Sequence, residues 1–326
     1  MTRLRTLALT AAAALSLTLT GCGLPERIVH LQDAPTVEHT GAPLRADAAE
    51  RIAARVLGEV AAAESADERR AAIYGPAMRV INAREEADVV SGTTSDVVVP
   101  TAPTVIALSE GEEWPRAILA ATLDQETQVQ SVHVLVSTGP ASPFRLYATA
   151  PMFAGTSVPS LGALADGADF ERATDEEPID QSAILEEYAK AVAFPAPEEE
   201  SADVSVEDPF ADSLRANAKA QSDALDDLAN LKQTNRAIPD SVTSFRTAGG
   251  GSLIFGQMVR EDVITLTDKA KELTIDNEVL QELSGKEKVT KRFTTESLKN
   301  LLFIQPADGP ATLIGAEEIV LRASGE

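Results

Sequence analysis

The chain is short of cysteine, histidine and aromatic residues. Cys22 is the single cysteine among 326 residues, so the sequence allows no internal disulfide and no cysteine-based metal site. The histidines, His30, His39 and His133, are too widely scattered to match a zinc-binding motif. Aromatic residues make up 4% of the chain, fewer than a sugar-binding cleft usually needs as stacking platforms. We therefore expect neither a metal nor a cofactor.

Basic residues are also scarce relative to acidic ones. The sequence has 51 Asp and Glu against 28 Lys and Arg, which gives a formal net charge of −23 at pH 7. A surface this acidic repels nucleic acid and anionic lipid head groups, so neither is an expected partner. Solubility is the simplest use of this charge, and a docking surface for a basic partner is the alternative.

Motifs that carry catalysis are missing as well. The sequence contains no G-x-S-x-G for a serine nucleophile, no H-E-x-x-H for zinc and no S-x-x-K. The run Gly249-Gly250-Gly251 lacks the x-x-G-K-[ST] of a phosphate loop, so it predicts a turn. We expect no enzyme and no catalytic residue. A hydrolase that works with a carboxylate pair is the third alternative, because the chain has so many acids.

An apolar run near the N-terminus is typical of an export signal. Leu7–Leu19 is 13 residues long, which suits a secretory signal and is too short to span a bilayer. Arg3 and Arg5 precede the run and supply the positive start of such a signal. The run ends at Leu19-Thr20-Gly21-Cys22, where an ordinary signal would end in small residues.

Leu19-Thr20-Gly21-Cys22 resembles the lipobox of bacterial lipoproteins. The resemblance implies a signal peptide over 1–21, cleavage between Gly21 and Cys22, and diacylation of the Cys22 thiol. Two acyl chains suffice for stable anchoring, so the mature chain is expected on the outer face of the cell membrane. Loss of the two leader arginines changes the net charge from −23 to −25, which leaves the acyl chains as the expected membrane contact. A plain secretory signal with an unrelated cysteine is the alternative.

The first half of the mature chain reads as helices followed by strands. Residues 22–44 lack periodicity and predict a tether that carries the lipidated cysteine. Apolar residues at helical spacing predict a helix over 45–64 and a second stretch over 66–87, interrupted at Gly75-Pro76. Strands are predicted at Val97–Val99, Val105–Leu108, Ile118–Leu123, Val129–Ser137 and Phe144–Met152.

An acidic, proline-broken stretch divides the chain. Acidic residues outnumber basic ones by 16 to 2 between Asp166 and Asp212. After a loop at 154–178 and a short helix at 180–193, residues 195–209 are predicted to be a linker. It would separate a first subdomain, 45–194, from a second, 210–326.

The second half repeats the layout of the first. A helix is predicted over 210–232, with Asp212 or Ser213 as its cap. A basic cluster at 286–292 is expected on an edge strand, where lysines discourage edge pairing. The predicted strands are Val242–Arg246, Leu253–Val259, Val263–Thr267, Leu273–Ile275, Val289–Phe293, Leu301–Ile304 and Ala311–Leu321.

Helices followed by strands, twice over, predict an α+β fold with two subdomains. The segments Trp114–Pro159 and Gly249–Phe255 look like those of uncharacterised actinobacterial-type lipoproteins. This resemblance implies two cystatin-like or NTF2-like halves, each a curved antiparallel sheet that wraps helices, and it implies no known activity.

Three side chains are the candidate ligand contacts. His133 alternates with Val132 and Val134, so it is expected on the more polar face of its strand. Tyr147 is expected to share one face of the next strand with Arg145 and Thr149, and Trp114 is expected at the start of a strand. Together they suggest a small ligand held on a curved sheet.

Two functions remain open on this reading. The first is a lipid-anchored, non-catalytic protein that binds a small ligand or a partner. The alternative is a structural or assembly lipoprotein that docks another envelope protein. A roomy apolar pocket inside either sheet would favour a small ligand, and filled cores in both would not.

Overall fold

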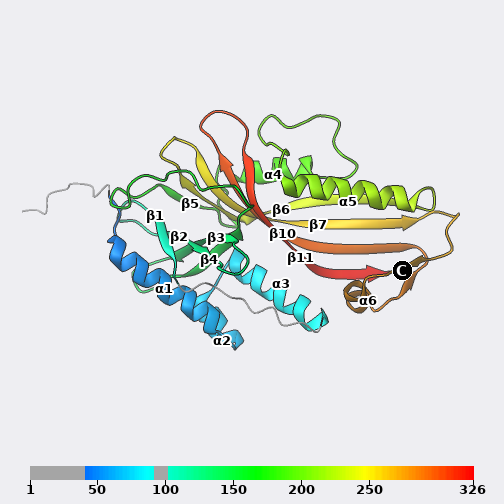
Figure 1. The fold of residues 1–326 in the computed structure, drawn as a ribbon, viewed down its shortest axis with the longest axis horizontal. Coiled ribbons are helices and arrows are strands. Elements are labelled where there is room, and N and C mark those ends of the chain that lie inside the picture. The colour runs from blue at the N-terminus through cyan, green and yellow to red at the C-terminus, as the bar shows by residue number, and fades with distance from the viewer. Residues whose placement is uncertain (1–40, 92–101) are drawn as a thin grey trace, which may run out of the picture. The chain divides into compact units, whose positions relative to one another are not determined.

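The computed structural model describes residues 41–91 and 102–326, which fold as helices on two antiparallel sheets (Figure 1). Gly21, Cys22 and most of the expected tether lie outside the described residues, as does the expected strand Val97–Val99. The predicted α+β class is confirmed, because both sheets are antiparallel and both carry helices.

The first sheet has four strands in the order β1-β2-β3-β4. Three helices precede it in the chain, and the predicted interruption at Gly75-Pro76 is confirmed, because one helix ends before it and the next begins at Pro76. The elements are α1 (Ala46–Ala62), α2 (Ala66–Ala72), α3 (Pro76–Ser91), β1 (Thr104–Leu108), β2 (Arg116–Leu123), β3 (Gln130–Ser137) and β4 (Arg145–Pro151).

Capping and periodicity explain the first helices. Ser65 accepts from the Glu68 amide while the Glu68 carboxylate accepts from the Ser65 amide, a capping box that starts α2. The apolar face of α1, with Val56 and Leu57 at its centre, packs against Ile118 and Leu135 of the sheet. Burying each such leucine contributes about 2 kcal/mol.

The second sheet has five strands in the order β11-β10-β7-β6-β5, and a separate two-stranded sheet pairs β8 with β9. Helices α4 and α5 lie along the five-stranded sheet, and α5 runs beside β6 (Figure 1). The elements are β5 (Phe170–Arg172), α4 (Ser182–Ala191), α5 (Pro209–Leu225), β6 (Ala229–Arg246), β7 (Ser252–Leu266), β8 (Leu273–Thr274), α6 (Glu278–Ser284), β9 (Lys288–Val289), β10 (Arg292–Gln305) and β11 (Thr312–Gly325).

The two sheets share a core. Side chains of the four-stranded sheet, among them Leu119 and Val134, pack directly against Phe255 and Leu302 of the five-stranded sheet. The opposite face of the four-stranded sheet is covered by α1 to α3, and the outer face of the five-stranded sheet by α4 and α5. Both faces of the four-stranded sheet are therefore filled.

Several predicted boundaries in the second half are wrong. The helix predicted to reach residue 232 ends at Leu225, and β6 begins at Ala229 because alternating side chains there pair with β7. The two strands predicted within 253–267 are one continuous strand, β7. Helix α6 was not predicted. Arg292 of the basic cluster begins β10, which has a neighbour on each side, so the expected edge position is wrong for this residue.

The segment 195–209 is tied to the second sheet. Phe194 exchanges backbone hydrogen bonds with Gln233, and buried Val204 forms a bridge with Ala311. Strand β5 and helix α4, which the sequence analysis placed in the first subdomain, both pack on the five-stranded sheet. The described residues belong to one unit by their contacts.

Candidate functional site

Tyr147 lies in the core between the two sheets and is 2% exposed. The register of β4 against β3 shifts between Val134 and Leu135, and this β-bulge turns Tyr147 to the same side as Ala148. The expectation that Tyr147 shares one face of its strand with Thr149 is therefore wrong. The Tyr147 hydroxyl donates to the backbone oxygen of Asp240, 3.2 Å away.

Tyr147 is one half of a tyrosine pair. Tyr74 lies beside it, with ring centroids 5.0 Å apart, and the Tyr74 amide bonds the Leu146 oxygen. Gly75 follows at φ +62°, and a Cβ there would lie 2.5 Å from the Tyr147 ring. The sharp turn between α2 and α3 therefore needs glycine, because a side chain would displace the tyrosine.

Two arginines lie at the ends of this pair. The Arg145 guanidinium is 4.3 Å from the Tyr74 ring centre, and that of Arg172 is 5.3 Å from the Tyr147 ring centre. We call Arg145, Tyr74, Tyr147 and Arg172 the arginine–tyrosine stack. Guanidinium groups favour aromatic faces because of the ring quadrupole, so the stack holds both cations in fixed positions.

His133 is buried, at 4% exposed, on the opposite face of the sheet from Tyr147. Its Nε2 is 2.8 Å from the Thr122 hydroxyl, and its Nδ1 is 2.9 Å from the Thr149 hydroxyl. Burial lowers the pKa of His133 to about 4, so the ring is neutral at pH 7. The strand face is polar at this point, as predicted, but the side chain is enclosed by protein.

Trp114 is half-buried just before β2, and the Arg116 guanidinium lies 4.4 Å from its ring centre. No contact between any two of Trp114, His133 and Tyr147 is recorded among the described residues. The three candidates therefore lie at separate places, and whether any of them contacts a ligand stays a prediction.

Sequence reasoning missed the two arginines of the stack. The sequence did mark Arg172 as unusual, because it is one of only two basic residues between Asp166 and Asp212. Nothing in the sequence marked Arg145 beyond its proximity to Tyr147.

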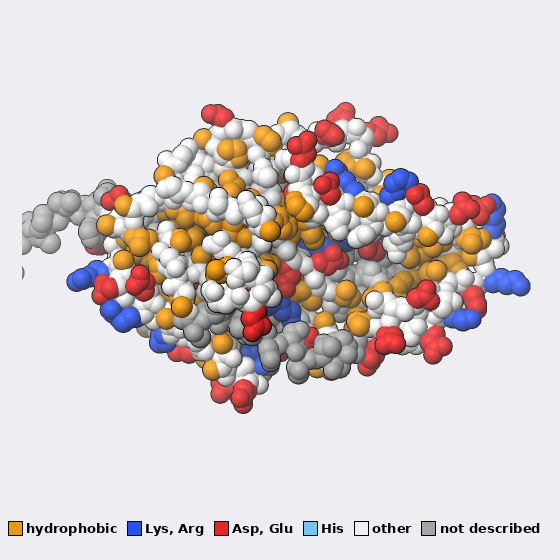
Figure 2. Space-filling view, in the orientation of Figure 1, with side chains coloured by type: hydrophobic (Ala, Val, Ile, Leu, Met, Phe, Trp, Pro, Cys, Tyr) orange, Lys and Arg blue, Asp and Glu red, His pale blue; other side chains and the backbone are white. Residues whose placement is uncertain are grey.

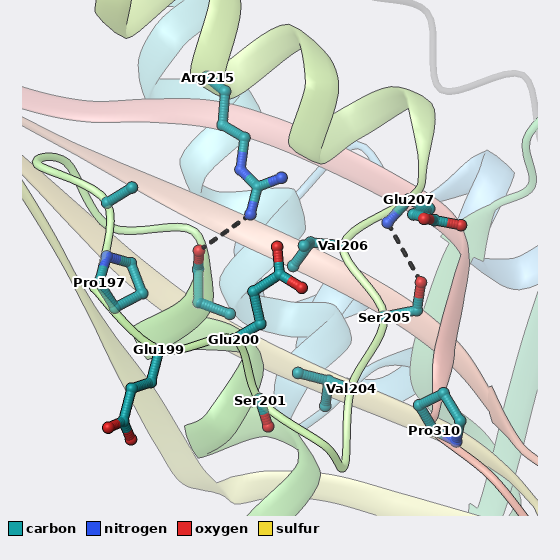
Figure 3. A pocket seen from close by; sticks show the side chains of 12 residues that line it. Pro197, Glu199, Glu200, Ser201, Val204, Ser205, Val206, Glu207, Arg215 and Pro310 are labelled. Atoms are coloured by element: carbon teal, nitrogen blue, oxygen red, sulfur yellow. Dashed lines mark hydrogen bonds between the residues drawn. The ribbon is translucent and has the colours of Figure 1, made fainter.

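A large hollow lies at the surface beside the segment between α4 and α5 (Figure 3). Its volume is about 680 Å³, and three carboxylates, Glu199, Glu200 and Glu207, line it. Arg215 of α5 points across the hollow and donates to the Ala191 oxygen at 3.5 Å. We call this the linker hollow, and its carboxylates suit basic groups of a partner.

A second hollow of about 420 Å³ lies beside the first turns of α4, where the glycine turn between β6 and β7 meets the turn between β10 and β11. A third, of about 210 Å³, lies over the five-stranded sheet between α5 and α6. Acidic side chains are spread over the face seen in Figure 2, with fewer basic ones between them.

An ion pair lies beside the third hollow. Lys299 of β10 is fully buried and pairs with Glu318, which lines the hollow. Burial lowers the pKa of Lys299 to about 8, and the Glu318 carboxylate opposes this shift. Arg260 pairs with Asp262 on the same sheet face. The sequence signal was a lysine that, with Asn300, interrupts the apolar run 298–303.

Two further properties of the described residues bear on function. No group of three or more His, Cys, Asp and Glu side chains in 41–91 and 102–326 is arranged to hold a metal ion. Among the same residues, no helix is long and apolar enough to cross a membrane.

Comparison with known proteins gives no relative. No family model, no curated protein and no solved structure matches this chain. The likeness to cystatin-like and NTF2-like halves therefore stays a prediction.

Proposed function

We propose that the protein is a lipid-anchored, extracytoplasmic lipoprotein that binds a partner at its surface and catalyses no reaction. The lipobox-like Leu19-Thr20-Gly21-Cys22 supports the anchor, and the acyl chains on Cys22 are its membrane contact. The partner is another protein of the cell envelope.

The observation that carries the binding role is the filled interior. Residues on both faces of the four-stranded sheet, such as Leu119 and Leu135, are 0% exposed, so a ligand held within that sheet would have to displace core side chains. The linker hollow, by contrast, is open at the surface and is lined by residues from 191–215 together with Pro310. Docking at the surface needs no rearrangement of the core.

The linker hollow also supports a second candidate function. A volume of about 680 Å³ lies within the range of small-molecule sites, so a cationic small ligand is the alternative occupant. Charged side chains, Arg215 and three glutamates, line it, whereas most such sites are predominantly apolar, and this favours a protein partner.

The anchor is tested by Cys22→Ala. The expected result is release of the protein into the culture medium, because no acyl chain then holds it. Retention in the membrane fraction would show that the anchor is wrong. A Cys22→Ser variant serves as the isosteric control and should behave in the same way.

The docking role is tested by chemical cross-linking in intact cells. Wild-type protein should give one recurrent protein partner, and changing Glu199, Glu200 and Glu207 together to Gln should reduce its yield at least about tenfold. The control changes three exposed acids outside the hollow to Gln, so that net charge is matched. These control positions are Glu50, Glu112 and Glu113. Equal loss in both variants would contradict docking at the linker hollow.

A further inference from the structure

Three arginines of the described residues have neither a carboxylate nor an aromatic ring as a partner. They are Arg215, Arg236 and Arg292, and every other described arginine pairs with a carboxylate within 4.0 Å or lies over a ring. Of the three, only Arg215 lines one of the three hollows, and that hollow is the linker hollow. In a chain with 51 acidic residues, this leaves positive charge uncompensated inside a hollow lined by carboxylates.

The Arg215 guanidinium has donors to spare. Its one hydrogen bond within the described residues runs from Nη2 to the Ala191 oxygen at 3.5 Å. This is longer than the roughly 2.7–3.2 Å of a regular N–H···O bond, so it is weak. Arg215 is exposed, and its remaining N–H groups are therefore accessible to a group that enters the hollow from solvent.

The linker hollow presents both signs of charge at separate places. Its three glutamates form no ion pair with Arg215, although all of them line the same hollow. Figure 3 shows Glu199 on the opposite side of the hollow from Arg215, with its carboxylate directed away. Apolar residues, among them Val204 and Val206, line the hollow as well. An occupant that matches this lining carries a negative group and a positive group at different places.

We propose that the segment of the partner that docks in the linker hollow carries a carboxylate beside its basic groups, and that Arg215 binds this carboxylate. A guanidinium fork matches the two oxygens of a carboxylate, whereas the glutamates of the hollow suit ammonium or guanidinium groups. This inference rests on the docking role proposed for the linker hollow and names the chemistry of the segment that docks there.

Arg215 also discriminates against the wrong segments. A protein with a net charge of −23 attracts any basic segment, so the glutamates alone give little selectivity. A purely basic segment in the hollow places its cations near the Arg215 guanidinium, and like charges repel. A segment with a carboxylate at that place avoids the repulsion and gains an ion pair. Arg215 is therefore the residue that determines specificity among basic segments.

The chemistry of the segment is tested by calorimetric titration of the purified protein with three peptides at constant ionic strength. They are acetyl-Lys-Lys-Ala-Ala amide, the same peptide with a free C-terminal carboxylate, and acetyl-Lys-Lys-Ala-Glu amide. The acidic net charge of the protein favours the first peptide, which is the most positive. We expect the reverse, with at least one carboxylate peptide bound at least about threefold more tightly than the first.

The order of the three affinities decides the outcome. Tightest binding of the peptide with the free C-terminus supports recognition of a chain end, and tightest binding of the glutamate peptide supports recognition of an internal acidic residue. Equal or weaker binding of both carboxylate peptides, relative to the first peptide, would overturn the proposal.

The role of Arg215 is tested by matched substitutions. Arg215→Gln should abolish the preference for carboxylate peptides, because glutamine keeps the helix propensity of α5 but carries no charge. Arg215→Lys keeps the charge and loses the planar fork, so part of the preference should remain. Arg236→Gln is the control, since Arg236 is also exposed and also without a carboxylate or ring, but does not line the hollow. An unchanged preference in Arg215→Gln, or an equal loss in the control, would overturn the assignment.

A purely structural role of Arg215 gives a different result in the same titrations. Its bond to the Ala191 oxygen caps the C-terminal end of α4, so its loss could lower the melting temperature. Such a loss weakens the three peptides alike and leaves their order unchanged. That result would contradict carboxylate recognition by Arg215.

Failure of the docking role itself is recognised with the variant in which Glu199, Glu200 and Glu207 are all changed to Gln. This variant should weaken binding of all three peptides, because their lysines lose their partners. Binding of all three as tight as in wild type would show that the docking role of the hollow is wrong. Weakened binding in this variant, together with no carboxylate preference in wild type, would show that only the role of Arg215 is wrong.

Discussion

The two sheets treat buried polar groups differently. The four-stranded sheet encloses His133, a neutral ring whose two nitrogens each lie at hydrogen-bond distance from a threonine hydroxyl. The five-stranded sheet also holds charges: the fully buried Lys299 pairs with the exposed Glu318, and the buried Arg260 pairs with Asp262. A satisfied neutral group costs little on burial, whereas a buried ion pair often contributes less than apolar residues of the same volume would. The charges in the five-stranded sheet are therefore poorly explained by stability alone.

The largest expected effect comes from removing the carboxylate that pairs with the fully buried Lys299. Glu318→Leu leaves Lys299 without its counter-ion and should lower the free energy of unfolding by about 3–4 kcal/mol, the lower part of the range for a buried pair, because Glu318 itself is exposed and its charge is screened by solvent. The double variant Lys299→Met with Glu318→Leu removes both charges and should be as stable as wild type or more so. Chemical denaturation measures both, and a double variant as unstable as the single one would show that the pair stabilises the sheet.

A smaller loss of stability is expected when helix caps are removed, and the loss should differ between the two regions. Asp208 caps α5 by accepting from the amides of Phe210 and Ala211, and its carboxylate also accepts from the Tyr188 hydroxyl. Asp208→Ala should cost about 3 kcal/mol, because it removes the cap and leaves a buried hydroxyl without an acceptor. Ser65→Ala at the exposed start of α2 should cost about 1 kcal/mol. Equal losses in thermal unfolding would contradict this difference in burial.

The smallest expected effect is on the pH dependence of stability, and it comes from the neutral histidine of the four-stranded sheet. The pKa of His133 is about 4 when folded and 6.5 in its ordinary state, so between these values the unfolded chain binds a proton that the folded chain does not. Stability should therefore fall by about 1.4 kcal/mol per pH unit as the pH drops below 6.5. His133→Gln should remove that part of the slope between pH 6.5 and 5.5. An unchanged slope in the variant would mean that His133 is protonated in the fold.

The fold class could be predicted from the sequence because it rests on local periodicity. The spacing of apolar residues along the chain is enough to predict helix α1 and strand β3. The long strand β6 could not be placed in the same way, since the polar residues after Ala229 become a strand only by pairing with β7. The wrong face for Tyr147 has a similar cause, because one extra residue in β4 reverses the alternation and leaves no local mark.

The candidate site was harder to predict than the fold. Tyr147 was named from its strand. Its neighbours Tyr74 and Arg172 come from segments about 75 and 25 residues away, and only tertiary packing brings them beside it. Composition predicted a linker at 195–209, but its apolar residue Val204 is buried, pairs with Ala311 and anchors the segment on the second sheet.

The most direct test of the account is a photo-cross-linking comparison between the two regions in intact cells. A photoreactive amino acid replaces Glu200 in the linker hollow in one strain and Glu59 on the exposed face of α1 in another. The account predicts that one envelope protein cross-links from position 200 and is absent from position 59. The same protein captured equally from both positions, or from position 59 alone, would contradict docking at the linker hollow.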